Sequence, residues 1–380
     1  MESFGGHKGY PNIEVNHMRV LHFVSTLNRN SGVMRVIMNY YTHIDRKKIQ
    51  FDFLYFIESE ISYADEIRAL GGNIYYIPKP GTSLRSIKAL KQFFAEHGKE
   101  YAWLHNHENY LMAILYPLAR KYGIKNVAVH SHLTEYSDKK LSALRNHFLC
   151  MPIRYLPVQR VACSEAAARF LYSTEQDVYV MQNMINADFY VYQADKRNEL
   201  RKQYDISDTA FVIGHIGRFV NQKNHIFLIE RFAEFHKANL DSKLLLVGSG
   251  PLEEDIKTKV RELNVEGAVI FAGQQKDMQG YLSMMDVFVL PSLFEGLPMV
   301  ALEAQANGLQ CLLADTITEE TAVGENVHFC SLENTDMWLD MLQQVKKNEG
   351  YSRALTTETK EKMDMTQLAK QLERYYCKER

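Results

Sequence analysis

Two glutamates eight residues apart, Glu295 and Glu303, lie in the segment of the chain with the most groups suited to binding a ligand, PSLFEGLPMVALEAQANG. Pro298 suits the first turn of a helix. The backbone N–H groups of residues 295–297 would then gather at a helix N-terminus, where they can bind an anion. The two carboxylates could flank a ligand that crosses the helix start. The alternative is an ordinary strand–helix unit whose glutamates are solvated.

A second candidate segment, GHIGRFVNQK, follows a predicted strand earlier in the chain. Arg218 and Lys223 could both hold a phosphate from the strand end, and Gly217 would let the backbone approach it. For this segment alone, ordinary surface charge is an equally good interpretation.

Two His-x-His pairs, His105/His107 and His130/His132, end two neighbouring predicted strands. Alternation along a strand places both members of a pair on one face, as zinc sites sometimes require. The surroundings offer few further ligands, so the sequence favours histidines that hydrogen-bond at a cleft edge and predicts no metal site.

The elements that must position these residues are short apolar runs alternating with helical stretches. The predicted strands are 19–25, 51–57, 73–78, 102–107, 126–132, 160–164, 178–183, 211–218, 243–250, 268–274, 286–292, 309–315 and 326–331. Near-continuous apolar strands between helices are typical of parallel sheets covered on both faces. We therefore predict an α/β chain of two Rossmann-like, doubly wound domains that face each other across a cleft, with ligands at the carboxyl ends of the strands.

Composition excludes several classes of protein. The 44 Lys and Arg residues balance 46 Asp and Glu residues, for a net charge of −2, which argues against a nucleic-acid partner. The five cysteines are far apart and lack C-x-x-C spacing, which fits a reducing compartment. No apolar run reaches the roughly 18 residues of a spanning helix, and no signal peptide is evident. We expect a cytoplasmic protein.

Together the two charged segments resemble the second domain of the GT4-type glycosyltransferases, which have the GT-B fold; the capsular and exopolysaccharide branch looks nearest. Glu295 and Glu303 reproduce an E-x7-E motif, G-R-x-x-x-x-K precedes it, and G-S-G-P-L lies between them. In the first half, LNRNSGVMRVIMNYY resembles the family's glycine-rich loop, with Ser31-Gly32 in place of Gly-Gly. VAVHSH resembles the strand whose terminal histidine faces the transferred sugar.

The order of strands and polar stretches, together with the resemblance, gives the expected domain limits. Residues 1–17 would be a flexible extension, 18–190 the acceptor-side domain and 191–359 the nucleotide-sugar domain. The polar stretch 186–208 would connect the two domains. The stretch TQLAKQLERYY resembles the helix that returns to the first domain, so 360–380 would pack there.

The resemblance implies a donor site built from both halves. Its nucleotide-sugar-binding residues would be Gly32, Arg218, Lys223, Gly273, Gln274, Glu295, Gly296, Leu297, Pro298 and Glu303. Arg218 and Lys223 would hold the diphosphate, and Gly32 would lie against it. Glu303 would accept hydrogen bonds from the ribose, and Gly273-Gln274 would lie near the base.

The catalytic residues implied are Glu295, at the transferred sugar, and His130, at the reacting carbon. His132 is the alternative, because the HSH repeat leaves the register open by one strand period. The resemblance implies a retaining hexosyltransferase that needs no metal or cofactor. It would use a nucleotide-diphosphate sugar, with UDP as the favoured nucleotide, and an oligosaccharide or lipid-linked acceptor in capsule or exopolysaccharide synthesis. The alternatives are a sugar-nucleotide epimerase or phosphorylase-like enzyme of this fold, a non-catalytic partner subunit, and a metal hydrolase.

One stretch suggests a membrane surface. Residues 139–160 contain five Lys and Arg residues and no acid, mixed with Leu, Phe, Met, Ile and Tyr. This pattern fits peripheral contact with anionic lipid on the inner face of the cell membrane. A basic solvated face over a core helix explains it equally well.

Overall fold

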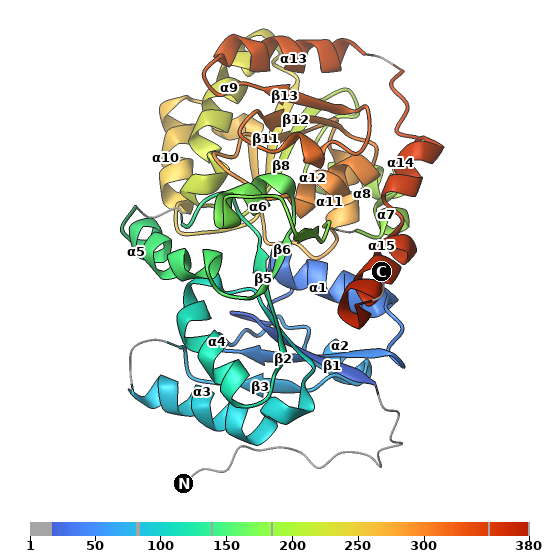
Figure 1. Ribbon diagram of the computed structural model, residues 1–380. Coiled ribbons are helices and arrows are strands. Elements are labelled where there is room, and N and C mark those ends of the chain that lie inside the picture. Colours follow the sequence, from blue (N-terminus) through green and yellow to red (C-terminus); the bar gives the residue numbers. More distant parts are fainter. Residues whose placement is uncertain (1–16, 81–83, 138–139, 184, 349, 379–380) are drawn as a thin grey trace.

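The computed structural model describes residues 17–80, 84–137, 140–183, 185–348 and 350–378. Two parallel sheets of seven and six strands carry helices on both faces and lie one above the other (Figure 1). The predicted α/β architecture of two doubly wound halves is therefore confirmed. Almost all of the proposed extension, 1–16, lies outside the described residues.

The first sheet has the order β3-β2-β1-β4-β5-β6-β7. Its strands are β1 (Met18–Phe23), β2 (Ile49–Tyr55), β3 (Ile74–Tyr76), β4 (Trp103–Asn106), β5 (Asn126–Ser131), β6 (Gln159–Ala162) and β7 (Val178–Val180). Its helices are α1 (Gly32–His43), α2 (Ala64–Ala69), α3 (Leu84–His97), α4 (Met112–Lys121), α5 (Lys140–Cys150) and α6 (Glu165–Tyr172).

The second sheet has the order β10-β9-β8-β11-β12-β13. Its strands are β8 (Phe211–Ile216), β9 (Ser242–Val247), β10 (Val269–Gly273), β11 (Val287–Leu290), β12 (Gln310–Ala314) and β13 (Val327–Cys330). Its helices are α8 (Ala194–Gln203), α9 (His225–Ala238), α10 (Glu253–Glu262), α11 (Met278–Met284), α12 (Met299–Ala306) and α13 (Thr335–Lys347).

Each sheet reverses its strand order at one point, between β1 and β4 in the first and between β8 and β11 in the second. At such a switch point the connections leave in opposite directions, so the carboxyl ends of the two strands open a space for a ligand. The His-x-His pairs begin within β4 and β5 and end one residue beyond them, and the two charged segments lie at the ends of β8 and β11. Both His-x-His pairs and both charged segments thus lie at the carboxyl edge of one of the two sheets.

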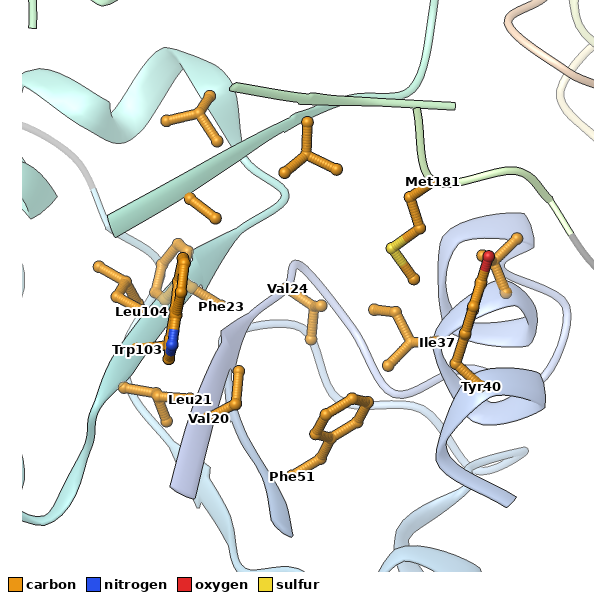
Figure 2. Packing of buried hydrophobic residues seen from close by; sticks show 14 of the residues in the cluster. Val20, Leu21, Phe23, Val24, Ile37, Tyr40, Phe51, Trp103, Leu104 and Met181 are labelled. Atoms are coloured by element: carbon orange, nitrogen blue, oxygen red, sulfur yellow. The ribbon is translucent and has the colours of Figure 1, made fainter. Parts of the chain in front are cut away.

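The core of the first half explains why its strands read as nearly continuous apolar runs. Val20 and Leu21 on β1 point to opposite faces of the sheet, and both are buried. Figure 2 shows Trp103 on one side of β1 and Tyr40 of α1 on the other. Because helices cover both faces, neither face of β1 needs polar side chains.

The end of the chain returns to the first half. Helix α15 (Met365–Cys377), after the short α14 (Thr357–Lys362), lies beside α1 (Figure 1). The indole Nε1–H of Trp103 donates a hydrogen bond of 3.1 Å to the carbonyl oxygen of Tyr376. The last helix therefore completes the core over β1 and β4.

The polar stretch 186–208 is more ordered than a simple connection. It forms α7 (Ala187–Tyr190) and α8, and α8 packs on α11. Arg197 and Arg201 both form ion pairs with Asp286, at 2.6 and 2.7 Å. This helix binds the second half mainly through buried guanidinium groups, which is why its sequence looked like a solvated linker.

No helix among the described residues is both long enough and apolar enough to cross a membrane.

Candidate active site

The loop between β11 and α12 carries the first glutamate of the candidate pair. Helix α12 begins at Met299, and Pro298 stands at the N-cap position, one residue earlier than a first-turn proline. Three successive carbonyl groups of the loop accept hydrogen bonds from the first half of the chain. The donors are Thr134 to Glu295 (2.9 Å), Ser164 to Gly296 (3.4 Å) and Asn183 to Leu297.

Gly296 marks the closest approach between this loop and the first half. A Cβ atom at this position would lie 2.0 Å from the carbonyl oxygen of His132 and 2.9 Å from the Cys163 sulfur. Backbone cannot move aside as a flexible side chain can, so only glycine fits without a shift. The loop therefore rests directly on the end of β5.

Lys223 and Glu295 meet at the second switch point. The Lys223 ammonium lies 2.5 Å from a Glu295 carboxylate oxygen, and both side chains are largely buried. Gln222 holds the two loops together, since its side chain donates to the Phe294 carbonyl at 2.9 Å. Gly217 lies below the lysine, where a Cβ atom would be 3.3 Å from the lysine side chain.

Arg218 is placed differently. Its side chain is exposed and makes no hydrogen bond or ion pair with the described part of the chain. The structure thus brings Lys223 and Glu295 together and leaves Arg218 available at the same strand end.

Glu303, on α12, is fully buried. One carboxylate oxygen forms an ion pair with Arg35 of α1 and accepts a hydrogen bond of 3.1 Å from the Tyr190 hydroxyl. The other oxygen, Oε2, has no partner among the described residues. Neither Arg35 nor Tyr190 was predicted from the sequence, although Arg35 lies three residues after Gly32 in the glycine-containing segment.

Gly32 and Gln274 lie in loops that meet. Gly32 opens α1, is exposed, and has open space where a Cβ atom would stand. The Gln274 side chain accepts from the Asn30 side chain at 3.2 Å and donates to the Ser249 hydroxyl at 2.7 Å. Gly273, just before it, has a φ of +66°, a backbone conformation that favours glycine.

Five histidines form one cluster on a single face of the first sheet: His22, His105, His107, His130 and His132. Their ring nitrogens pair along two chains. In one chain, His105 lies 2.5 Å from the Tyr376 hydroxyl and 3.2 Å from His130. In the other, His107 lies 3.0 Å from His22 and 2.7 Å from His132. The cluster includes both His-x-His pairs and a fifth histidine that the sequence reasoning missed.

Burial keeps these imidazoles neutral. It lowers the pKa of His22 and of His132 to about 3, and it lowers the pKa values of His105, His107 and His130 well below the usual range. A charged imidazole would lose its hydration here without gaining a carboxylate partner.

Two sets of three histidines have nitrogens within 4.8 Å of one another, close enough to share a metal ion. A metal would need a lone pair from each ring. The nitrogen pairs instead lie at hydrogen-bond distance, where one ring supplies N–H and the other a lone pair. The geometry therefore fits a hydrogen-bonded network better than a metal site.

The expectation that His105 and His107 lie at a cleft edge is wrong for these rings: they are 0% and 8% exposed. The reason is that α15 closes over this face of the sheet, with Tyr376 against His105. His130 is also fully buried, while His132, just past β5, is half-buried.

The sequence profile described as "Glycosyl transferases group 1" matches residues 196–362, which contain the charged segments and Glu295 and Glu303. A Bacillus subtilis protein with the name "Putative glycosyltransferase EpsF" is 32% identical over 316 residues, 80% of this chain and 81% of that protein. An Escherichia coli enzyme, UDP-Gal:alpha-D-GlcNAc-diphosphoundecaprenol alpha-1,3-galactosyltransferase, is 23% identical and covers 80% of this chain and 79% of its own length.

Among solved structures, HepE of Anabaena in complex with UDP and glucose superposes with a TM-score of 0.79. The match covers 95% of this chain and all of HepE at 14% identity, which shows the fold alone. A further match, at a TM-score of 0.73, is WaaG, a glycosyltransferase involved in lipopolysaccharide biosynthesis. The two facing Rossmann-like halves are thus the GT-B fold, and the chain belongs to the group 1 glycosyltransferase family.

Proposed function

We propose that this protein transfers a hexose, with retention of configuration, from a nucleotide-diphosphate sugar to an oligosaccharide or lipid-linked acceptor in capsule or exopolysaccharide synthesis. The observation that carries the proposal is the meeting of Glu295, Lys223 and Glu303 with the end of β5 and the start of α1. A UDP-linked donor is favoured, because the E. coli relative is named for UDP-Gal and HepE was solved with UDP and glucose.

In this proposal the second half binds the nucleotide. Lys223 and the exposed Arg218 hold the diphosphate and neutralise the charge that develops as it leaves. Glu303, whose Oε2 has no partner among the described residues, accepts hydrogen bonds from the ribose. Gln274 and Gly273 lie near the base, and the exposed start of α1 at Gly32 faces the phosphate, as helix N-termini do.

The transferred sugar would lie between the two halves. Glu295 and the backbone N–H groups of Gly296 and Leu297 contact its hydroxyls from one side, next to Pro298, which has no N–H, and His130 contacts it from the other. The departing phosphate helps to deprotonate the acceptor on the same face, so configuration is retained. No metal takes part in these steps.

Calorimetric titration of UDP and of GDP into the protein tests the donor site. We expect micromolar binding of UDP, unchanged by EDTA. Lys223→Ala and Glu303→Ala should each weaken it at least tenfold, because each removes a charge or a charge-assisted hydrogen bond from the nucleotide. Lys237→Ala, far along α9, is the matched control and should bind normally. Equal binding by all four proteins, or binding that EDTA abolishes, would contradict the assignment.

The release of UDP from UDP-sugars, measured with and without a lipid extract containing carrier-linked oligosaccharides, separates the roles of the residues. Glu295→Ala and His130→Ala should lower turnover by about 10² or more while UDP still binds. Unchanged turnover in both variants would contradict the assignment of the sugar site. Donor turnover that needs no acceptor would instead favour an epimerase.

We also propose that the enzyme contacts an anionic membrane through α5. Leu141, Leu144 and Phe148 are 85%, 57% and 62% exposed and share one helical face. Lys140 and Arg145 are exposed on the same helix, which has no acidic residue. An apolar stripe beside basic groups suits the headgroup region of an anionic bilayer. Lys139 lies outside the described residues.

Flotation with vesicles tests this contact. The protein should float with vesicles that contain roughly 30% phosphatidylglycerol. It should stay at the bottom of the gradient with vesicles of pure phosphatidylcholine. Leu144→Glu combined with Phe148→Glu should abolish flotation and leave UDP binding intact. Leu240→Glu, at another exposed leucine, is the control and should float like wild type. Flotation that survives the double substitution would overturn the α5 surface.

A further inference from the structure

A series of buried hydrogen bonds leads from Tyr376 on α15, near the end of the sequence, through His105 to His130. The Tyr376 hydroxyl lies 2.5 Å from His105 Nδ1, and His105 Nε2 lies 3.2 Å from His130 Nδ1. All three side chains are at most 2% exposed. Beyond this chain, the remaining nitrogen of His130, Nε2, is buried without a hydrogen-bond partner in the described protein.

The Tyr376 hydroxyl decides which group donates in each of these hydrogen bonds. A neutral imidazole has one nitrogen that donates and one that accepts. If the Tyr376 O–H donates to His105 Nδ1, then His105 Nε2 carries the hydrogen and donates to His130 Nδ1. His130 must then carry its own hydrogen on Nε2.

The opposite direction leaves more groups without partners. His105 Nδ1–H would then donate to the tyrosine oxygen, so the buried Tyr376 O–H would lose its acceptor. His130 Nε2 would also be left as an acceptor with no donor. The first direction also leaves one buried donor, the His130 Nε2–H, without an acceptor in the described protein, so the two directions differ by the acceptor that only the opposite direction leaves without a donor. An unpaired buried polar group costs about 1–3 kcal/mol, so the first direction is favoured.

We propose that Tyr376 is a positioning residue, which acts through His105 to hold the hydrogen of His130 on Nε2, so that His130 offers an N–H donor to an oxygen of the transferred sugar. The inference rests on the proposed function, in which His130 faces that sugar. In this arrangement the histidine binds and orients the sugar as a hydrogen-bond donor and does not act as a base.

The neighbouring tyrosine provides a matched control. Tyr375 lies on the same helix, and its ring stacks on Tyr179 at 4.3 Å. Its hydroxyl is buried without a hydrogen-bond partner in the described chain. Tyr375→Phe therefore removes the same atom from the same helix without touching the histidines.

Nitrogen NMR of histidine-labelled protein gives the direct test, with the His130 signals assigned by their loss in His130→Gln. Wild type and Tyr375→Phe should show His130 protonated at Nε2. Tyr376→Phe should show a mixture of the two tautomers, a turnover lower by about tenfold, and an unchanged KM for the donor. An unchanged tautomer or an unchanged turnover in Tyr376→Phe would overturn the inference.

A second pair of variants tests the same link without altering α15. His105→Gln keeps an N–H that can donate to His130 Nδ1 and should retain most of the turnover. His105→Leu removes it and should lose as much as Tyr376→Phe. Equal turnover in the Gln and Leu variants would contradict the proposed link.

Two further outcomes separate this inference from the proposed function. If wild type fails to bind UDP, the proposed function fails, yet the tautomer of His130 still tests the chain of hydrogen bonds. If adding Zn²⁺ or EDTA shifts the His105 and His130 signals together, the cluster holds a metal and the inference is wrong.

Discussion

Glu303 is a fully buried carboxylate whose ion-pair partner, Arg35, comes from the opposite half of the chain. The Arg35 side chain remains 23% exposed, so the pair lies at the boundary between protein and solvent. A buried charge that loses its partner costs more than the pair gains, because the remaining charge has no hydration. Arg35 therefore supplies the opposite charge beside a carboxylate that has no hydration of its own.

We expect Arg35→Met to lower the free energy of unfolding by about 3 kcal/mol, because Tyr190 alone would then contact the buried carboxylate. The double variant Arg35→Met/Glu303→Gln removes the charge as well and should recover at least half of that loss. Urea unfolding of both variants measures the difference. Equal stability of the single and double variants would show that the carboxylate does not depend on Arg35.

At this scale the sequence singled out candidate residues but not the side chains that contact them. The E-x7-E spacing was enough to select Glu295 and Glu303, since both lie in one short segment. Arg35 and Tyr190 could not be found in this way. They reach Glu303 only after the chain has folded across 268 and 113 positions, and no local pattern records that distance.

The loop between β11 and α12 connects the two halves more tightly than its length suggests. Its carbonyl groups accept three hydrogen bonds from the first half, and Gly296 touches the backbone of His132. Any ligand held by this loop is therefore fixed relative to β5 as well.

Gly296→Ala should separate the loop from β5, because its Cβ atom would lie 2.0 Å from the His132 oxygen. We expect a loss of about 1–3 kcal/mol in stability and a fall in turnover of at least tenfold. Gly267→Ala, where a Cβ atom meets nothing within 4 Å, is the control and should behave like wild type. Thermal melts and UDP release measure both effects, and identical results for the two variants would refute the close contact.

The sequence predicted helices and strands well where they pack through apolar side chains and poorly where they pack through polar ones. Each of the predicted strand segments overlaps a strand, because buried parallel strands need continuous apolar residues. Helix α8 was missed within a polar stretch, since Arg197 and Arg201 bind the second half by hydrogen bonds to backbone carbonyls and to Asp286. Hydrophobic periodicity cannot reveal a helix that packs through guanidinium groups.

For the molecule as a whole, the five neutral histidines couple folding to pH. The pKa of His22 is about 3 in the folded protein and near 6.5 when the chain is unfolded. Between these values the unfolded chain binds a proton that the folded protein does not. Stability is therefore complete above about pH 6.5 and is lost as the pH falls.

We predict that the free energy of unfolding falls steeply from pH 6.5 to 5.5, by about 1 kcal/mol for each such histidine. His22→Phe, whose ring can stack on Phe51 and Phe53, should show a shallower fall. Denaturant unfolding at the two pH values measures both slopes. Parallel curves for the two proteins would mean that His22 is not held neutral by folding.

The overall arrangement of two facing sheets followed from the alternation of strands and helices, but the histidine cluster did not. Two pairs were visible as His-x-His, while His22 stands alone in β1 and Tyr376 lies at the far end of the chain. Only the strand order, with β1 beside β4, brings them together.

The position of α15 also sets an order of events during synthesis. Trp103 and His105 are covered by Tyr376, 271 or more positions later in the chain. A ribosome adding roughly 5–20 residues per second needs well over ten seconds to make that stretch. From the end of β7 at Val180 until α15 is made, the first sheet is complete in sequence but lacks the helix that covers its histidines. We therefore expect the nascent first half to expose that face to chaperones until the final helix emerges.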